Sequence, residues 1–217
     1  MPRRTCAAWP TSWGRRSTTR PWPPNWRPRV SRFRRGCAGL LCLLLSGPAA
    51  AEPPERQPPV WLRVDTDRLE LHVMRDGERL RTYDNIAIGR YGATTAKRAG
   101  DGMTPLGEFH IVRIATRTDF HRFYGLDYPN LAHARAGLQA GRITATQFAR
   151  IRQALHRGIE PPQHTALGGY IGIHGLGDGD PAVHADFNWT EGCIALTNEQ
   201  VDDLAQWIDK GVRVVIE

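Results

Sequence analysis

A mainly β fold, with an inserted helical segment and one helix near the C-terminus, is predicted by three features of this 217-residue sequence. Apolar and polar residues alternate in short stretches, which is typical of half-buried strands. Glycine, proline and aspartate separate these stretches, as turns require. Apolar residues recur at helical spacing in only two places, around 144–158 and 197–211. We therefore expect a β-sandwich or partial barrel with helices at its margin.

The predicted strands follow one another along most of the chain after residue 59. They are expected at 60–64, 68–73, 80–88, 109–114, 166–173 and 212–216. Asp76-Gly77 favours a tight hairpin turn, because both residues tolerate the positive φ angles that such a turn needs. His72 falls on the polar phase of its strand and is predicted to be exposed. The glycines in 166–173 indicate a central strand that a neighbouring backbone approaches closely.

Two helices are predicted from capping residues together with apolar spacing. Thr144 and Gln147 form a capping box at the start of the first helix, which belongs to an inserted segment at 131–164. Thr197 and Gln200 form a second capping box, and Gly211 ends that helix. The apolar stripes of both helices are expected to pack against the rest of the fold.

The first 51 residues have the composition of a basic leader with a secretory signal peptide. They contain ten arginines and no acidic residue. A basic stretch at 32–35 precedes an apolar run at 37–46, and small residues at 48–51 supply a cleavage site after Ala51. The apolar run is shorter than the roughly 20 residues that span a bilayer. The translation start is either Met1 or a residue near Val30, and 52–59 reads as a proline-rich linker before a domain at 60–217.

Removing the leader changes both the charge and the cysteine count. The net charge of +7 becomes −3 for residues 52–217, because the leader carries ten positive charges. Bulk charge therefore gives no support for binding nucleic acid. Cysteines 6, 37 and 42 lie in the leader, which leaves Cys193 alone in the exported chain. A single thiol there is either a reactive group or an inert, buried one, and its neighbours must decide between these.

His174 and Cys193 stand at the two ends of one polar loop and match the needs of acyl transfer. A thiol attacks as thiolate, and an imidazole can take its proton and later return it to a leaving amine. Gly192 has no Cβ, so the backbone can turn there and aim consecutive N–H groups at a developing oxyanion. His174 ends a predicted strand, which would hold its direction rigidly.

At these residues the sequence resembles the L,D-transpeptidase catalytic domain family of YkuD type, close to its YafK-like murein-processing subgroup. Fifteen residues separate His174 from Thr190-Glu191-Gly192-Cys193, as in the family signature. The turn at 104–109, Asn198 and the closing stretch at 211–216 also match, so that the resemblance runs from about Trp61 to the C-terminus. It implies the mainly β YkuD fold and a role in peptidoglycan biosynthesis or remodelling, with effects on cell shape.

The resemblance also implies a role for each residue of the loop. Cys193 would be the nucleophile that forms a thioester with a stem peptide, and His174 would be the general base and acid, oriented by the backbone carbonyl of Gly175. Backbone N–H groups of residues 191–193 would form the oxyanion hole, and Thr190 would stabilise the loop. The donor in this family is a tetrapeptide stem, which is cut between its diamino acid and the terminal D-Ala.

Two positions depart from the family pattern, and both are expected to contact substrate. Glu191 stands where the family has histidine, and Ala195 where it has arginine or asparagine. His184, Asp186 and Tyr128 are further candidate substrate contacts. No metal and no cofactor are expected, because the spacings of His174, His184 and Cys193 match no zinc pattern.

Three functions remain open from the sequence. The first is an exported, monomeric acyltransferase of the periplasm that acts on peptidoglycan stem peptides. The second is a cysteine hydrolase, an L,D-carboxypeptidase or an amidase that releases a wall-linked peptide or lipoprotein with the same residues. The third is an inactive wall-binding module. No nucleic-acid partner and no membrane span in the mature chain are predicted.

Overall fold

The computed structural model describes residues 59–217. The predicted leader and residues 52–58 of the predicted linker lie outside the described residues. The strands are β1 Trp61–Asp65, β2 Glu70–Arg75, β3 Glu78–Tyr83, β4 Ala93–Thr94, β5 Thr104–Pro105, β6 Gly107–Thr118, β7 His121–Leu126, β8 Gly172–His174, β9 Ile194–Ala195 and β10 Arg213–Ile216. The helices are α1 Leu131–Gln139, α2 Ala145–His156, α3 Pro181–Asp186 and α4 Asn198–Leu204, followed by a 3₁₀ turn at Ala205–Trp207.

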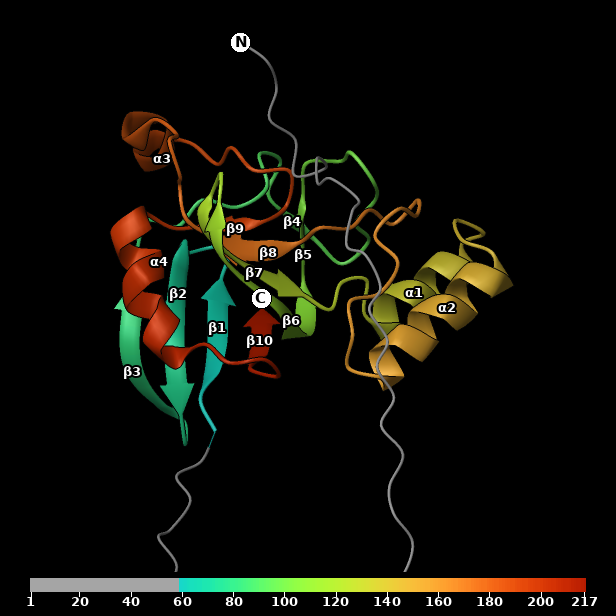
Figure 1. Cartoon of the computed structure of the whole chain (residues 1–217). Coiled ribbons are helices and arrows are strands. Elements are labelled where there is room, and N and C mark those ends of the chain that lie inside the picture. The colour runs from blue at the N-terminus through green and yellow to red at the C-terminus, as the bar shows by residue number, and fades with distance from the viewer. Residues whose placement is uncertain (1–58) are drawn as a thin grey trace, which may run out of the picture. The chain divides into compact units, whose positions relative to one another are not determined.

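Eight of the strands form one mixed sheet, in the order β3-β2-β1-β10-β6-β7-β8-β9. The β1–β10 and β8–β9 pairs are parallel, and the other neighbours in this sheet are antiparallel. β4 and β5 form a separate two-stranded sheet. The prediction of a mainly β fold with marginal helices is confirmed, and Figure 1 shows α4 on one side of the molecule and the α1–α2 pair on the other.

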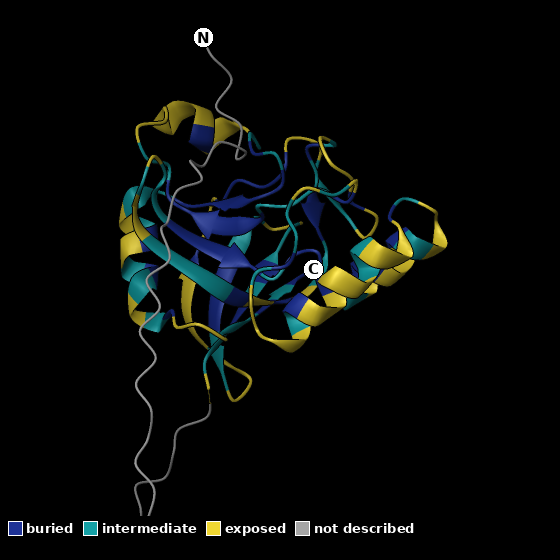
Figure 2. Ribbon diagram, turned by 45° about the vertical axis from the view of Figure 1, so that its right-hand side comes forward, coloured by how far each residue is buried: buried dark blue, intermediate teal, exposed yellow. Residues whose placement is uncertain are grey.

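The core is divided into a large cluster inside the sheet and a small one beneath the inserted helices. The large cluster draws on nearly every strand of the sheet and on Val201 and Leu204 of α4. Ala134, Ile151 and Leu167 are central to the small cluster. In Figure 2 the dark blue of buried residues follows the strands, whereas α1 and α2 turn exposed faces to solvent. The helical insertion thus packs through its own small core.

Both predicted capping boxes are present. The side chain of Thr144 accepts from the amide of Gln147, and that of Thr197 accepts from the amide of Gln200. Helices α1 and α3 escaped prediction. Asn130 caps α1 and Asp180 caps α3, but each helix is short and neither shows a long apolar stripe.

Three sequence-based expectations need correction. The strand predicted at 80–88 ends at Tyr83, because Asn85 takes a φ of +52° and Ala87 then forms an isolated bridge with Ala195 of β9. Within the stretch 166–173 only Gly172 and Ile173 belong to a strand, since Tyr170 has a φ of +56°. His72 is buried rather than exposed, with Nδ1 3.2 Å from the hydroxyl of Thr82.

Candidate active site

The strand pair β8–β9 brings His174 and Cys193 to the same face. β8 ends at His174, and the chain leaves through α3 before β9 returns parallel to β8. The register pairs His174 with Ala195, and Cys193 lies two residues before Ala195. Side chains two residues apart along an extended chain share a face, so the thiol and the imidazole lie on one side of this pair.

Close packing of the backbone explains the glycine at the start of β8. A Cβ on Gly172 would lie 2.6 Å from Cζ of Phe123 and 2.7 Å from the carbonyl oxygen of Tyr124, both on β7. The predicted close approach of a neighbouring backbone is therefore confirmed at this residue. The contact presses β8 against β7 and fixes where His174 emerges.

The imidazole of His174 is fully buried and held at one nitrogen. Nδ1 lies 2.7 Å from the carbonyl oxygen of Gly175. A carbonyl can only accept, so Nδ1 carries the hydrogen and Nε2 has the lone pair. Nε2 has no hydrogen-bond partner within residues 59–217. Burial lowers the pKa of His174 to about 4, so the ring is neutral at pH 7 and can accept a proton at Nε2.

The thiol of Cys193 is 1% exposed and donates to a backbone carbonyl. Its Sγ lies 3.2 Å from the oxygen of Tyr170, a residue held in a left-handed conformation. Tyr170 lies two residues before the start of β8, so the same short segment carries both the imidazole and the carbonyl that accepts the thiol hydrogen. In this arrangement the thiol is protonated and turned toward Tyr170.

Thr190 ties the turn before the cysteine into a compact ring. Its hydroxyl donates to the carbonyl of Cys193 at 2.7 Å and accepts from the amide of Gly192 at 3.0 Å. Its own amide and carbonyl bond to Ile88 and Arg90, which anchors the turn to the neighbouring segment. The hydroxyl is therefore used twice, as buried polar groups require.

Gly192 could carry no side chain in this turn. Its φ is +127°, and a Cβ would lie 2.4 Å from the carbonyl oxygen of Met103 and 2.9 Å from Nζ of Lys97. Because its amide donates to Thr190, that amide is already committed inside the turn. The sequence predicts three backbone amides for an oxyanion hole, at residues 191, 192 and 193. The amide of Gly192 donates to the hydroxyl of Thr190 instead.

Lys97, which the sequence reading did not single out, lies buried beside the cysteine turn. It is 3% exposed, and its ammonium donates to Asp101 Oδ1 at 2.8 Å, to the Met103 carbonyl at 2.7 Å and to the Glu191 carbonyl at 3.1 Å. Burial raises the pKa of Asp101, but hydrogen bonds from Lys97 and from backbone amides outweigh burial and leave that pKa below its ordinary value.

Trp189 stands between His174 and His184. Its ring centroid is 5.9 Å from that of His174 and 6.4 Å from that of His184, and its Nε1 donates to Nδ1 of His184 at 3.3 Å. His184 is buried, and burial lowers its pKa. Its place against Trp189 makes it a support for the ring beside His174 rather than an exposed substrate contact.

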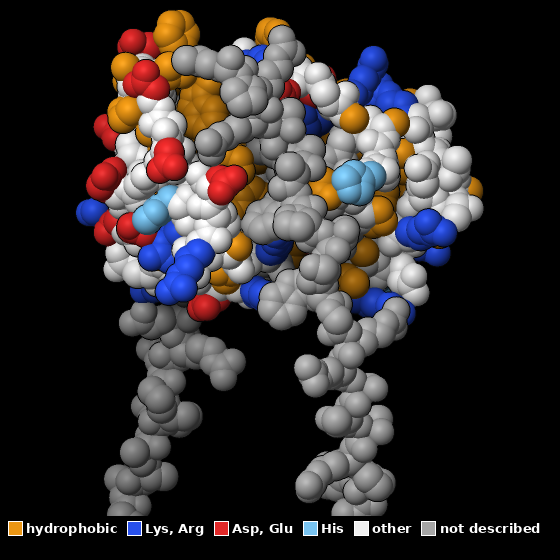
Figure 3. All heavy atoms as spheres, turned by 45° about the horizontal axis from the view of Figure 1, so that its top comes forward, with side chains coloured by type: hydrophobic (Ala, Val, Ile, Leu, Met, Phe, Trp, Pro, Cys, Tyr) orange, Lys and Arg blue, Asp and Glu red, His pale blue; other side chains and the backbone are white. Residues whose placement is uncertain are grey.

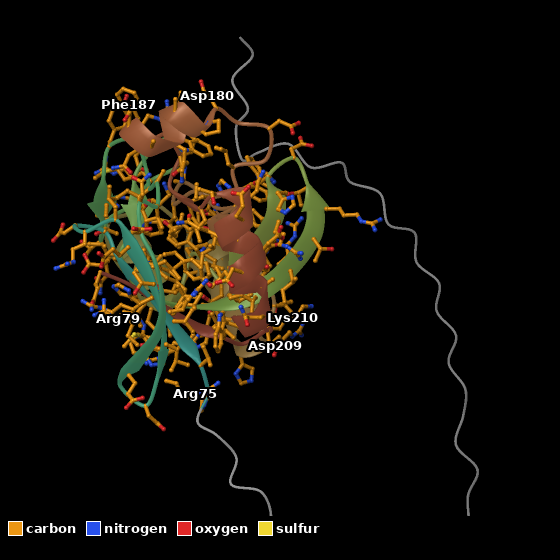
Figure 4. The ribbon with its side chains drawn as sticks, turned by 90° about the vertical axis from the view of Figure 1, so that its left-hand side faces the viewer. Arg75, Arg79, Asp180, Phe187, Asp209 and Lys210 are labelled. Atoms are coloured by element: carbon orange, nitrogen blue, oxygen red, sulfur yellow. The ribbon has the colours of Figure 1, made fainter. Side chains whose placement is uncertain are left out.

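Helix α3 covers this end of the molecule and exposes apolar side chains. Val183 and Phe187 are exposed, Phe187 to 65%, and Asp186 is exposed at the end of the helix. Figure 4 labels Asp180 and Phe187 at the two ends of α3, far from the β2–β3 turn at Arg75. In Figure 3 acidic and apolar side chains lie together over this region.

Two predicted substrate contacts lie in the interior instead. Tyr128 is fully buried, and its hydroxyl donates to the carbonyl of Leu167 at 2.7 Å. Ala195 is fully buried in β9 and exchanges two backbone hydrogen bonds with Ala87. Tyr128 packs in the large core cluster. Ala195 pairs with His174 in the register of β8 and β9, so its buried methyl group lies on the same face as the imidazole and the thiol.

Glu191 is half-buried at the rim of a cleft of about 390 Å³. Its carboxylate pairs with Arg90. The cleft is lined by Lys97, Ala99, Gly100, Gln163, His164, Thr165, Gly168, Gly169, Tyr170 and Glu191. It shares Tyr170 and Glu191 with the surroundings of the thiol, so a ligand in the cleft would lie against the cysteine turn.

Comparison with known proteins gives one family match and several similar folds. Residues 59–216 match the model of the YkuD L,D-transpeptidase catalytic domain. No curated protein matches the sequence. The helical cell shape determining protein Pgp2 from Campylobacter jejuni is similar in structure, with 23% identity, 75% of this chain and 48% of that chain covered, and a TM-score of 0.52.

An L,D-transpeptidase from Xylanimonas cellulosilytica is similar over 76% of this chain and 63% of that chain, with 16% identity and a TM-score of 0.41. This chain spans about half the length of the Pgp2 structure. At such identities the likeness to Pgp2 shows the fold alone.

Proposed function

The chain belongs to the YkuD L,D-transpeptidase catalytic domain family, and on that premise we propose that it is an exported cysteine acyltransferase that acts on peptidoglycan stem peptides. One observation carries the proposal. A buried neutral imidazole, oriented through Nδ1 and with no partner at Nε2 among the described residues, shares a face with the thiol of Cys193. A base and a nucleophile in this relation are what acyl transfer through a thioester needs.

The first half of the proposed reaction forms the thioester. The thiol leaves the carbonyl of Tyr170 and turns to His174, whose Nε2 takes its proton. The thiolate attacks the carbonyl carbon between the diamino acid and the terminal D-Ala of a stem. The tetrahedral intermediate collapses as the protonated imidazole gives its proton to the leaving amine of D-Ala. The stem is then held on Cys193 as a thioester.

The second half releases the stem and restores the enzyme. An amine of a second stem attacks the thioester carbonyl while His174 takes a proton from the attacking nitrogen. The thiolate leaves and recovers that proton from the imidazole. Water in place of the amine would give the hydrolase reaction with the same residues. The cleft beside Tyr170 and Glu191 is the proposed place of the donor stem.

The oxyanion is proposed to lie against the backbone of the cysteine turn. The amide of Gly192 donates to Thr190, so we assign the stabilising contact to the amides of Cys193 and Glu191. Thr190 and Gly192 act by shaping the turn that presents these amides. Hydrogen bonds aimed at the developing charge are commonly the largest single contribution to catalysis of this kind.

Export and place of action are part of the same proposal. The predicted signal peptide directs the chain to the periplasm, where stems are accessible, and the proposed result is remodelling of the wall and of cell shape. In the described domain, no helix has the length and apolar character needed to cross a bilayer.

The test uses the full-length protein and disaccharide muropeptides with tetrapeptide stems, and it reads products by mass. Dimers that lack one D-Ala are expected, and Cys193→Ala should yield none. Loss of D-Ala without dimers would establish the hydrolase instead. A wild-type protein that leaves the muropeptides unchanged, although folded and with Cys193 accessible to alkylation, would contradict the proposal.

A further inference from the structure

We propose that Lys97 is a positioning residue, which fixes the peptide unit between Glu191 and Gly192 and places a positive charge beside the cysteine turn. The inference rests on the proposed function, because it concerns the same cysteine. Lys97 lies 94 residues before Glu191 in the chain, and only the fold brings the two together.

Every hydrogen of the Lys97 ammonium has an acceptor within the protein. The acceptors are the carboxylate of Asp101, the carbonyl of Met103 and the carbonyl of Glu191. An ammonium has three N–H donors, so none is left over for a substrate. Lys97 lines the cleft, but its contacts assign it to holding the loop rather than to binding a ligand.

One peptide unit of the cysteine turn is held at both of its ends. Its carbonyl, that of Glu191, accepts from Lys97, and its N–H, that of Gly192, donates to Thr190. Fixing both ends sets the plane of this peptide. Because Gly192 is the residue before Cys193, the plane determines the direction in which the cysteine leaves the turn.

The ammonium also brings its charge to the cysteine turn. Nζ bonds to the carbonyl of Glu191, two residues before Cys193, and a Cβ on the intervening Gly192 would lie 2.9 Å from it. A nearby cation favours a thiolate over a thiol. The other charged or titratable groups around the turn are Asp101, Arg90, Glu191, His174 and His184.

These neighbours leave Lys97 with a distinct electrostatic role. Arg90 pairs with Glu191, and burial keeps both histidines neutral at pH 7. Asp101 offsets part of the charge of Lys97 through their ion pair. Removing Lys97 should therefore disfavour the thiolate, and removing the charge of Asp101 should favour it, so that the two substitutions act in opposite directions.

The experiment measures the alkylation of Cys193 by iodoacetamide as a function of pH in the full-length protein. Peptide mapping by mass spectrometry separates Cys193 from cysteines 6, 37 and 42. The alkylation midpoint is the pH at which the rate of Cys193 alkylation is half of its maximum. In Lys97→Met this alkylation midpoint should rise by roughly one pH unit, and in Asp101→Asn it should fall. In the muropeptide assay Lys97→Met should lower kcat by about tenfold or more while KM changes little, because the substitution displaces Cys193 without removing a contact to the substrate.

Thr144→Ala is the control for a general loss of stability. It removes the capping box of α2, which is remote from the turn, and should lower the melting temperature without moving the midpoint. If Lys97→Met does not fold, Asp101→Asn decides alone. A midpoint that falls supports the proposal, and one that stays or rises overturns it.

A folded Lys97→Met with the wild-type midpoint would likewise overturn the inference. The alkylation does not depend on turnover. A wild-type protein that is inactive on muropeptides, but whose variants show the two opposite shifts, would refute the proposed function and leave the assignment of Lys97 standing.

Discussion

Replacing Gly192 by alanine is the most direct test of the geometry of the cysteine turn. The φ angle of +127° is one that residues with a side chain rarely adopt. The added Cβ would also lie 2.4 Å from the carbonyl oxygen of Met103, about 1 Å closer than ordinary contact. The added Cβ is fixed by the backbone at residue 192, and the carbonyl of Met103 is backbone itself. Since neither group can rotate away, the cysteine turn or the segment at Met103 must move.

The expected cost follows from these two effects. A strained backbone conformation costs about 1–3 kcal/mol. Overpacking of a filled interior costs about 1–3 kcal/mol more. Together they amount to about 2–6 kcal/mol, a large share of the 5–15 kcal/mol by which domains are typically stable. A shift of roughly 1 Å at the neighbouring Cys193 should lower turnover by about 10²-fold.

The assay compares urea unfolding and muropeptide turnover of Gly192→Ala with those of Gly77→Ala. Gly77 has a φ of +80° in the β2–β3 turn, and a Cβ there would meet nothing within 4 Å. This control carries the conformational cost of about 1–2 kcal/mol without the clash, and it is far from the cysteine. Equal destabilisation of the two variants, with turnover intact in both, would refute the reasoning.

Three further predictions concern the same site. Thr190→Val should destabilise the fold by about 1–3 kcal/mol, because the buried amide of Gly192 and the carbonyl of Cys193 lose their partner. Thr190→Ser, which keeps the hydroxyl, should retain most of the wild-type stability in urea unfolding. A valine variant as stable as wild type would contradict this prediction. Acidification from pH 7 to pH 5 should cost about 2 kcal/mol for each of His174 and His133. Burial lowers the pKa of both histidines from 6.5 to about 4. The stability that the neutral rings contribute above pH 6.5 is therefore lost as pH falls toward 4. Equal urea midpoints of unfolding at pH 7 and pH 5 would contradict this prediction. Trp189→Ala should expose the His174 ring to solvent and raise the pKa of His174, whereas Trp189→Phe should keep that pKa low. An NMR titration of the His174 imidazole measures both values. Equal pKa values in the two variants would rule out shielding of His174 by the ring of Trp189.

The sequence predicts the chemistry of the site from residue types that lie on one continuous loop. His174 and Cys193 close a single loop, and Gly192 stands next to the cysteine. Capping boxes at Thr144 and Thr197 are local patterns of the same kind, and both are present. Such features need no knowledge of distant contacts, since each involves residues a few positions apart or one continuous loop.

Reading along the chain did not show how deeply the side chains around the site are buried. Tyr128 packs in the large core cluster, Ala195 is buried next to His174, and His184 contacts Trp189 from a buried position. Neighbourhood in sequence does not say which face a residue takes in a short strand or a six-residue helix. The local pattern there is too brief to show a period.

The sequence by itself determined the mainly β class and the capped helices, and it predicts the base and the nucleophile, because periodicity, capping and a cysteine loop depend on residues close together in the chain. Only the tertiary structure decided which groups hold Cys193 in place. Lys97 donates a hydrogen bond to Glu191, which lies 94 positions later in the chain. The thiol of Cys193 donates to the carbonyl of Tyr170, which lies 23 positions earlier. Contacts of this kind arise when the sheet closes, since burial then forces each polar group to find a partner that the linear order does not indicate.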